Sequence, residues 1–216
     1  MSGMSLWERI FAAAYDPFMA ASEETGLARH RQALLATASG RVLEVGGGTG
    51  ANLPFYGDGV TEVVITEPSA PMAGRLARKL ARRTLRAPVR LVQAPAERLP
   101  FEAASFDCAV TTLVLCTVAD LARSLAEVRR VLKPRGRLLF IEHVRSGDAR
   151  LARHQHRLNW LNQLVMCCDC NRPTLGTIEQ AGFTVADVEH TELPKAPPFV
   201  RPTVTGCAMV PVAARR

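Results

Sequence analysis

The chain has 216 residues, a length that suits one domain or one domain with a lid. Its hydrophobic content of 48% and charged content of 22% are ordinary for a soluble globular protein. No apolar run reaches the roughly 18 residues that a membrane-spanning helix requires. Glu8 and Arg9 interrupt the apolar N-terminal stretch, so this stretch does not fit a secretion signal. We therefore expect a cytoplasmic protein.

Two helices are expected at the N-terminus, at roughly 5–15 and 22–38, and we interpret residues 1–39 as a lid. Four large apolar residues share one face of the first helix: Leu6, Trp7, Ile10 and Phe11. Such a face favours packing of the lid on the domain, and weak peripheral contact with a membrane surface is the alternative.

The net charge of +7 raises the question of a nucleic-acid partner. Much of this charge lies on an expected helix over 69–83 or close to it: Arg75, Arg78, Lys79, Arg82, Arg83 and Arg86. Three apolar residues recur every four positions along the same helix: Met72, Leu76 and Leu80. This spacing is typical of an amphipathic helix with a solvated basic side, and no aromatic residues are interleaved to stack on bases. We expect no nucleic-acid partner.

Strands and helices alternate after the lid, which is typical of a parallel sheet with helices on both faces. The expected strands cover 41–45, 63–66, 89–93, 106–111, 138–142, 183–188 and 203–210. The expected helices cover 69–83, with Ser69 as N-cap, 120–132, with Asp120 as N-cap, 149–166 and 174–181. The last two strands follow one another across the loop 192–202, so we predict a hairpin that carries an antiparallel edge strand.

The first expected strand runs into a glycine-rich loop at 44–50, Glu-Val-Gly-Gly-Gly-Thr-Gly. Ligands of such folds bind at the carboxyl ends of the strands, where glycines let the backbone turn sharply and approach a ligand. Gly46, Gly48 and Ala51 fit the pattern G-x-G-x-x-G/A, so the loop alone does not separate a nicotinamide cofactor from S-adenosylmethionine. Glu67 ends the second strand about 20 residues later, where a carboxylate binds the ribose hydroxyls of either cofactor.

Further sequence blocks distinguish the two cofactors. They are Glu44-x-Gly46-x-Gly48-x-Gly50, Ala96-Glu97-Arg98-Leu99-Pro100-Phe101 and Leu132-Lys133-Pro134-Arg135-Gly136-Arg137-Leu138. Together, over at least 41–142, they resemble the methyltransferase type 11 family, which also includes the quinone methyltransferases. The resemblance implies a Rossmann-like class I methyltransferase of the α/β class. Its seven-stranded sheet would be mostly parallel with an antiparallel last strand, and its cofactor would be S-adenosylmethionine.

The same resemblance implies a set of cofactor contacts. The methionine part would lie beside Glu44, Gly46, Gly48 and Gly50, the ribose beside Glu67, and the adenine beside Ala96 and Glu97, with Thr112 and Leu113 as a wall. We add Asn52 and Met72 to this set.

The resemblance also organises the chain as a single domain over 1–216, with a cofactor-binding core at 40–145. Residues 146–216 would supply substrate-side helices and the final strand pair. Arg135 is a departure, because the family usually has glycine there. A type II turn would force a positive φ on Arg135, and a type I turn would not.

A narrower resemblance extends over nearly the whole chain. The matching segments are Val114-Leu115-Cys116-Thr117-Val118, Glu142-His143-Val144, Gln155, Cys168…Arg172-x-Thr174 and Leu193-Pro194…Val200-Arg201-Pro202. They are similar to the methyltransferase-like 7 group, which includes membrane-associated alkyl thiol methyltransferases. The human members carry an N-terminal hydrophobic anchor that we do not find in this sequence. The resemblance implies a small apolar or amphipathic acceptor, with thiol, amine, phenol and quinone all open.

His143 follows the fifth expected strand, where a base that faces the acceptor would be useful, and we take it as the candidate catalytic residue. A histidine that only positions the substrate or bonds to a loop is the alternative. Two other functions also stay open, a non-catalytic module that binds the cofactor or its product S-adenosylhomocysteine, and an NAD(P)-dependent reductase.

Two histidines lie in the expected helix 149–166 and three cysteines follow it: His154, His156, Cys167, Cys168 and Cys170. Their spacing matches no standard zinc pattern, so we expect no metal site. Four apolar residues of the same helix would line an acceptor pocket or pack the lid: Trp160, Leu161, Leu164 and Val165.

Overall fold

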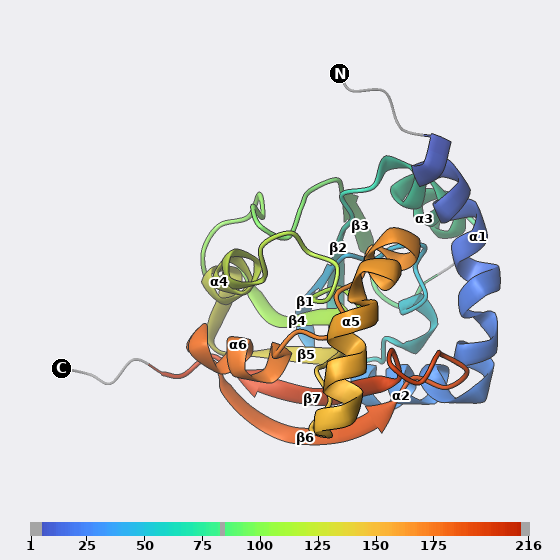
Figure 1. Cartoon of the computed structure of the whole chain (residues 1–216). Coiled ribbons are helices and arrows are strands. Elements are labelled where there is room, and N and C mark those ends of the chain that lie inside the picture. Colours follow the sequence, from blue (N-terminus) through green and yellow to red (C-terminus); the bar gives the residue numbers. More distant parts are fainter. Residues whose placement is uncertain (1–5, 83–84, 213–216) are drawn as a thin grey trace.

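The computed structural model describes residues 6–82 and 85–212, and its centre is a seven-stranded sheet in the order β3-β2-β1-β4-β5-β7-β6 (Figure 1). The strands are β1 (Gly40–Val45), β2 (Val60–Thr66), β3 (Val89–Val92), β4 (Phe106–Thr112), β5 (Leu132–His143), β6 (Thr184–Glu192) and β7 (Pro202–Met209). Strands β1 to β5 pair in parallel, and β7 is antiparallel to both β5 and β6. The predicted α/β fold with an antiparallel last strand is confirmed.

The prediction that the antiparallel strand lies at the edge of the sheet is wrong. Strand β7 lies between β5 and β6, so the edge strand is β6. Val204 and Ala208 of β7 are fully buried, whereas Glu189 and His190 of β6 are exposed. A strand with buried apolar side chains suits the interior of a sheet, and a polar strand tolerates an unpaired edge.

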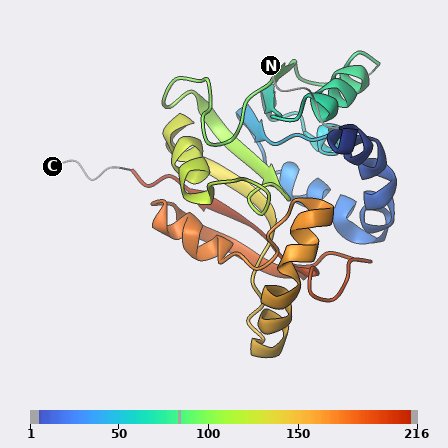
Figure 2. The same cartoon turned by 45° about the horizontal axis from the view of Figure 1, so that its top comes forward.

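Helices cover both faces of the sheet, as Figure 2 shows. They are α1 (Leu6–Ser22), α2 (Ala28–Leu35), α3 (Ala70–Leu80), α4 (Leu121–Val131), α5 (Ala149–Met166) and α6 (Thr174–Gln180). On one face, Leu125 of α4 and Ile178 of α6 share a core with Leu43 of β1. On the other, α2 and α3 pack Leu35 and Leu76 against the sheet. Leu43 and its neighbour Val42 in β1 thus belong to different cores, because side chains alternate between the two faces of a strand.

The N-terminal helices are more continuous than predicted. Helix α1 runs through Pro17, which is exposed, as far as Ser22, and a π-helical segment with a kink at Gly26, Glu23–Leu27, joins it to α2. The predicted start at residue 5 lies outside the described residues. Three members of the predicted apolar face are exposed and do not pack on the domain: Leu6, Trp7 and Ile10.

The predictions for the N-termini of α3 and α4 and for the turn at Arg135 had different outcomes. Asp120 caps α4, because its carboxylate accepts a hydrogen bond of 2.9 Å from the N–H three residues later. Ser69 is the N-cap residue of α3, as predicted, although its hydroxyl makes no capping hydrogen bond and its own N–H donates to Glu67. Arg135 adopts a φ of 63°, so the turn takes the less favourable of the two expected forms.

Candidate active site

The glycine loop follows β1 and turns at the carboxyl end of the sheet. Gly46, Gly48 and Gly50 have positive φ angles of 66°, 54° and 83°. An added Cβ at Gly46 would lie 2.7 Å from Cγ2 of Val114, and one at Gly50 would lie 2.6 Å from Cδ1 of Leu76. An added Cβ at Gly48 would meet nothing within 4 Å. Glycine suits all three backbone conformations, and the open side of Gly48 leaves room for a ligand to approach the backbone.

Glu67 follows β2 and lies beside this loop. One carboxylate oxygen accepts a hydrogen bond from the Gly48 N–H and the other from the Ser69 N–H, both at 2.8 Å. Burial raises the pKa of Glu67, and the two N–H groups act in the opposite direction. Each oxygen keeps a lone pair, so the carboxylate can still accept a hydrogen bond from a hydroxyl group.

A buried polar network supports the glycine loop. Glu44 accepts hydrogen bonds from the Asn52 amide at 3.0 Å and the Tyr56 hydroxyl at 2.7 Å, and burial raises the pKa of Glu44 to about 7. Arg31 of α2 donates to Asn52 Oδ1 and to Thr112 Oγ1, both at 2.8 Å. Both oxygens of Glu44 therefore have protein partners, and Glu44 holds Asn52 in place.

Arg31 was not among the predicted site residues. It is 3% exposed, and its Nε also donates to the Glu23 carboxylate at 3.0 Å. A sequence signal existed, because Arg31 lies midway between Leu27 and Leu35 at intervals of four residues. Both leucines are buried, so Arg31 occupies the apolar side of α2 and needs buried partners.

Asp16 of α1 was also missed, and it links α1 to the glycine loop. Its carboxylate accepts hydrogen bonds from the Thr49 hydroxyl and, at 3.0 Å, from Lys79 Nζ of α3. Arg75 Nη2 lies 3.8 Å away. We predicted that the basic side of α3 is solvated. This prediction is wrong for part of that side, which packs on α1. Arg83, assigned to that helix, lies outside the described residues.

The other predicted cofactor residues follow the carboxyl ends of β2, β3 and β4. Met72 and Ala96 are buried. Glu97 accepts hydrogen bonds of 2.9 and 3.2 Å from the two backbone N–H groups of residues 119 and 120, just before α4. Thr112 belongs to the Arg31 network, and Leu113 follows it with a φ of 59°.

A cavity of about 480 Å³ lies next to Leu113 and His143. Its walls come from α1, the segment after β4, the C-terminal half of α5 and the loop 193–201. Apolar atoms dominate the lining, and no described residue of the lining is a carboxylic acid. A cavity of this kind suits a small apolar molecule without a positive charge.

His143 ends β5 and lines this cavity. It is 5% exposed, and its Nδ1 is buried without a hydrogen-bond partner in the described part of the chain. Burial lowers the pKa of His143 to about 4, while the backbone at Pro202 and Val200 acts in the opposite direction. The imidazole is therefore neutral at neutral pH and has a nitrogen that can accept a hydrogen bond or a proton.

The histidines of α5 and the cysteines that follow it do not come together. His154 and His156 are exposed on α5, whereas Cys168 and Cys170 are buried. Within 6–82 and 85–212, no group of three or more metal-ligating side chains is placed to hold a metal ion.

The apolar residues of α5 divide into two pairs. Leu161 and Val165 line the cavity, which agrees with the prediction that they line a pocket. Trp160 and Leu164 are 63% and 65% exposed, so they neither line the cavity nor pack the lid.

Comparisons with known proteins show the family to which this chain belongs. Residues 43–140 match a family model described as a methyltransferase domain. Human thiol S-methyltransferase TMT1A is 33% identical over 178 residues, which cover 78% of this chain and 70% of that protein. Phosphatidylethanolamine N-methyltransferase of Cereibacter sphaeroides is 30% identical over 148 residues, which cover 65% of this chain and 72% of that protein.

Solved structures share the fold. A chain from the complex between the Haloferax volcanii Trm112 methyltransferase activator and a methyltransferase aligns with a TM-score of 0.72 at 18% identity. The alignment covers 97% of this chain and 100% of that chain. The sheet order and the glycine loop thus define a class I methyltransferase fold. The chain belongs to the methyltransferase type 11 family and is an S-adenosylmethionine-dependent methyltransferase.

Proposed function

We propose that this enzyme methylates the sulfur of small apolar thiols, with the cavity beside His143 as the acceptor site. The observation that carries the proposal is a mainly apolar cavity that combines a neutral histidine, whose Nδ1 has no hydrogen-bond partner, with a lining free of carboxylic acids among its described residues. The similarity to a thiol S-methyltransferase supports it. An amine would enter as a cation and find no carboxylate to balance its charge. Phenol and quinone acceptors are the remaining alternatives.

We propose that the cofactor occupies the glycine loop, with the open side of Gly48 as its closest approach to the backbone. Gly46 and Gly50 would shape the loop around the methionine part, and Glu67 would bind the ribose. Glu44 and Asn52 would act indirectly, because their buried hydrogen-bond network supports the glycine loop. The other contacts would come from Met72, Ala96, Glu97, Thr112 and Leu113. When bound, S-adenosylmethionine supplies an activated methyl group on a positively charged sulfur.

The chain itself must align the acceptor, exclude water and remove one proton. A thiol R–SH becomes the thioether R–S–CH₃ and releases H⁺, while the cofactor leaves as S-adenosylhomocysteine. The acceptor sulfur gains positive charge as the new carbon–sulfur bond forms, so its proton becomes strongly acidic. We propose that the imidazole of His143 accepts this proton and passes it to solvent. Residues 1–39 would close the site as a lid, 40–145 would hold the cofactor, and 146–216 would shape the acceptor side of one domain.

Acceptors that differ only in the reacting group test the proposed acceptor class. We expect the highest kcat/KM for an alkyl thiol, and a far lower value for the amine and alcohol with the same alkyl chain. A phenol and a quinone of similar size complete the series, with thioether formation followed by mass spectrometry. Preference for the amine, the phenol or the quinone would overturn the thiol assignment.

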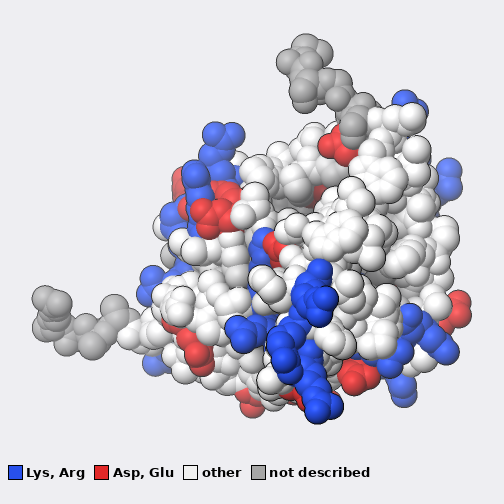
Figure 3. All heavy atoms as spheres, in the orientation of Figure 1, with Lys and Arg blue, Asp and Glu red and all other residues white. Residues whose placement is uncertain are grey.

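We further propose weak contact with a membrane surface. Figure 3 shows a largely uncharged area over α1 and the upper part of α5, next to basic residues over the lower part of α5. Exposed apolar residues of these two helices include Trp7 and Phe18 of α1 and Trp160 of α5. No helix among the described residues is both long and apolar enough to span a bilayer.

We expect the protein to sediment partially with anionic vesicles. The double variant Trp7→Ser, Trp160→Ser should sediment less, because it lacks two exposed apolar side chains. Equal sedimentation of the two proteins would contradict the membrane contact.

A further inference from the structure

The segment after β4, Leu113–Val118, forms one wall of the acceptor cavity, and we call it the β4 loop. Leu113, Cys116 and Thr117 line the cavity. The loop forms a single helical turn, in which the N–H groups of Thr117 and Val118 donate to the Val114 carbonyl at 2.8 and 3.2 Å. One turn of this kind has little stability of its own, so its position depends on the contacts around it.

Two buried or half-buried charges hold the opposite ends of the β4 loop. At its start, the Val114 N–H donates to both oxygens of the Glu142 carboxylate at 3.1 and 3.0 Å. At its other end, the Arg172 guanidinium donates to the carbonyls of Leu115 and Val118, both at 2.8 Å. A carboxylate at the N–H end and a guanidinium at the carbonyl end match the dipole of the turn.

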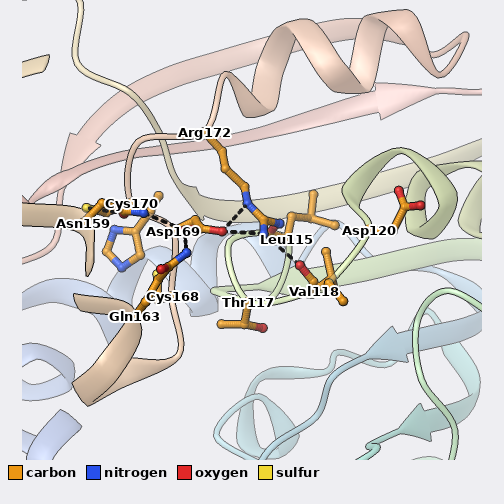
Figure 4. Close-up of polar contacts among 12 residues, drawn as sticks. Leu115, Thr117, Val118, Asp120, Asn159, Gln163, Cys168, Asp169, Cys170 and Arg172 are labelled. Atoms are coloured by element: carbon orange, nitrogen blue, oxygen red, sulfur yellow. Dashed lines mark hydrogen bonds and ion pairs between the residues drawn. The ribbon is translucent and has the colours of Figure 1, made fainter. Parts of the chain in front are cut away.

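Arg172 is in turn oriented by Asp169, as Figure 4 shows. The Asp169 carboxylate accepts hydrogen bonds from Arg172 Nη2 at 2.6 Å and Nε at 3.1 Å. Its other oxygen accepts hydrogen bonds from Asn159, at 2.6 Å, and Gln163, both on α5. The Asp169 N–H donates to the Cys116 carbonyl at 2.7 Å. Asp169 thus contacts two of the segments that form the cavity walls, the β4 loop and α5.

The segment around Arg172 also contacts the strand end that carries His143. The Arg145 N–H donates to the Arg172 carbonyl at 2.9 Å, and the Thr174 hydroxyl donates to the His143 carbonyl at 3.1 Å. Helix α5 depends on such polar contacts, because its two buried residues are Gln155 and Asn162. Gln155 donates to the carbonyls of Val144 and Cys170 at 3.0 and 2.9 Å.

We propose that Asp169 and Arg172 are positioning residues that set the distance between the β4 loop, α5 and His143, and so determine how the acceptor is aligned. The proposal rests on the assignment of this cavity as the acceptor site. Neither residue lines the cavity, so both act through the walls they hold. Small displacements at such walls have large kinetic effects, because transfer requires close alignment of the reacting atoms.

The protein offers a matched control in Arg130. Its guanidinium pairs with Glu127 at 2.6 Å and donates to the carbonyls of Phe101 and Leu99 at 2.8 and 3.0 Å. The ion pair has the same three-residue spacing as Asp169 and Arg172. None of these residues lines the cavity. Arg130→Ala therefore removes the same kinds of contact at a distance from the proposed acceptor site.

The test compares Arg172→Ala with Arg130→Ala by kinetics and by amide hydrogen exchange of the full chain. We expect Arg172→Ala to raise the KM for the acceptor about tenfold and to lower kcat. The Kd for S-adenosylhomocysteine should stay within about twofold, and exchange should accelerate at residues 114–118. Arg130→Ala should leave the acceptor KM and this exchange unchanged. If Arg172→Ala does not fold, Arg172→Lys replaces it, because one ammonium group cannot donate to both carbonyls in the same geometry.

Wild-type kinetics and exchange at 114–118 in both variants would contradict the positioning role, as would an equal rise in acceptor KM for Arg130→Ala. If the wild-type enzyme methylates none of the acceptors tested, the proposed function fails. The exchange comparison still tests the positioning role in that case.

Discussion

Glu67→Ala should weaken the binding of S-adenosylhomocysteine by about 1–3 kcal/mol, which is a factor of roughly 5–150 in Kd. The substitution removes the predicted contact with the ribose. It also leaves the Gly48 and Ser69 N–H groups without the acceptor that each has at 2.8 Å. The loop therefore loses part of its support together with its ligand contact. Titration calorimetry with S-adenosylhomocysteine measures the effect directly.

Glu62→Ala is the matched control for this variant. Glu62 lies on the same strand, β2, and pairs with Arg41 at 2.7 Å, with about a third of each side chain exposed. Loss of such a pair costs little and touches no part of the proposed cofactor site. Equal Kd values for wild type, Glu62→Ala and Glu67→Ala would remove Glu67 from the site.

His143→Gln should lower kcat by a factor on the order of 10² and leave the Kd for S-adenosylhomocysteine unchanged. Glutamine retains a hydrogen-bonding group in the cavity but cannot accept the proton. His190→Gln is the control, because His190 lies exposed on β6. Full turnover of His143→Gln at saturating acceptor would reduce His143 to a structural residue.

The pH dependence adds a second test of His143. Its pKa, lowered to about 4 by burial, keeps the imidazole neutral at any pH well above 4. The profile of kcat/KM for an alkyl thiol should therefore be flat between pH 6 and 9, because the acceptor reacts as the protonated thiol and the imidazole stays neutral throughout this range. His143→Gln should lower this profile without changing its shape. A wild-type limb with a midpoint at pH 6–7 that disappears in the variant would show that His143 titrates in the working range.

Local sequence patterns were sufficient for most of the fold and for the backbone features of the proposed cofactor site. The strand that ends at Val45, the glycines with positive φ and the acid after β2 are all features of short segments. The cap at Asp120 is equally local. Such features depend on neighbours within a few residues, so composition and spacing reveal them.

The missed features depend on contacts between distant segments. Asp16 meets Thr49 and Lys79 across 33 and 63 residues, and Arg172 meets Leu115 across 57. The insertion of β7 beside β5 is of the same kind. No local pattern encodes these pairs. A polar residue among buried positions of a helix is still a usable signal of a buried polar contact, as Arg31 in α2 and Gln155 in α5 show.

A crystal structure of the enzyme with S-adenosylhomocysteine and an alkyl methyl thioether tests the central claim most directly. We expect S-adenosylhomocysteine along the glycine loop, with its ribose on Glu67 and its sulfur facing the cavity beside Leu113. The thioether sulfur should lie in that cavity within reach of the His143 imidazole. A cofactor sulfur that faces away from the cavity, or a thioether bound elsewhere, would contradict the proposed site.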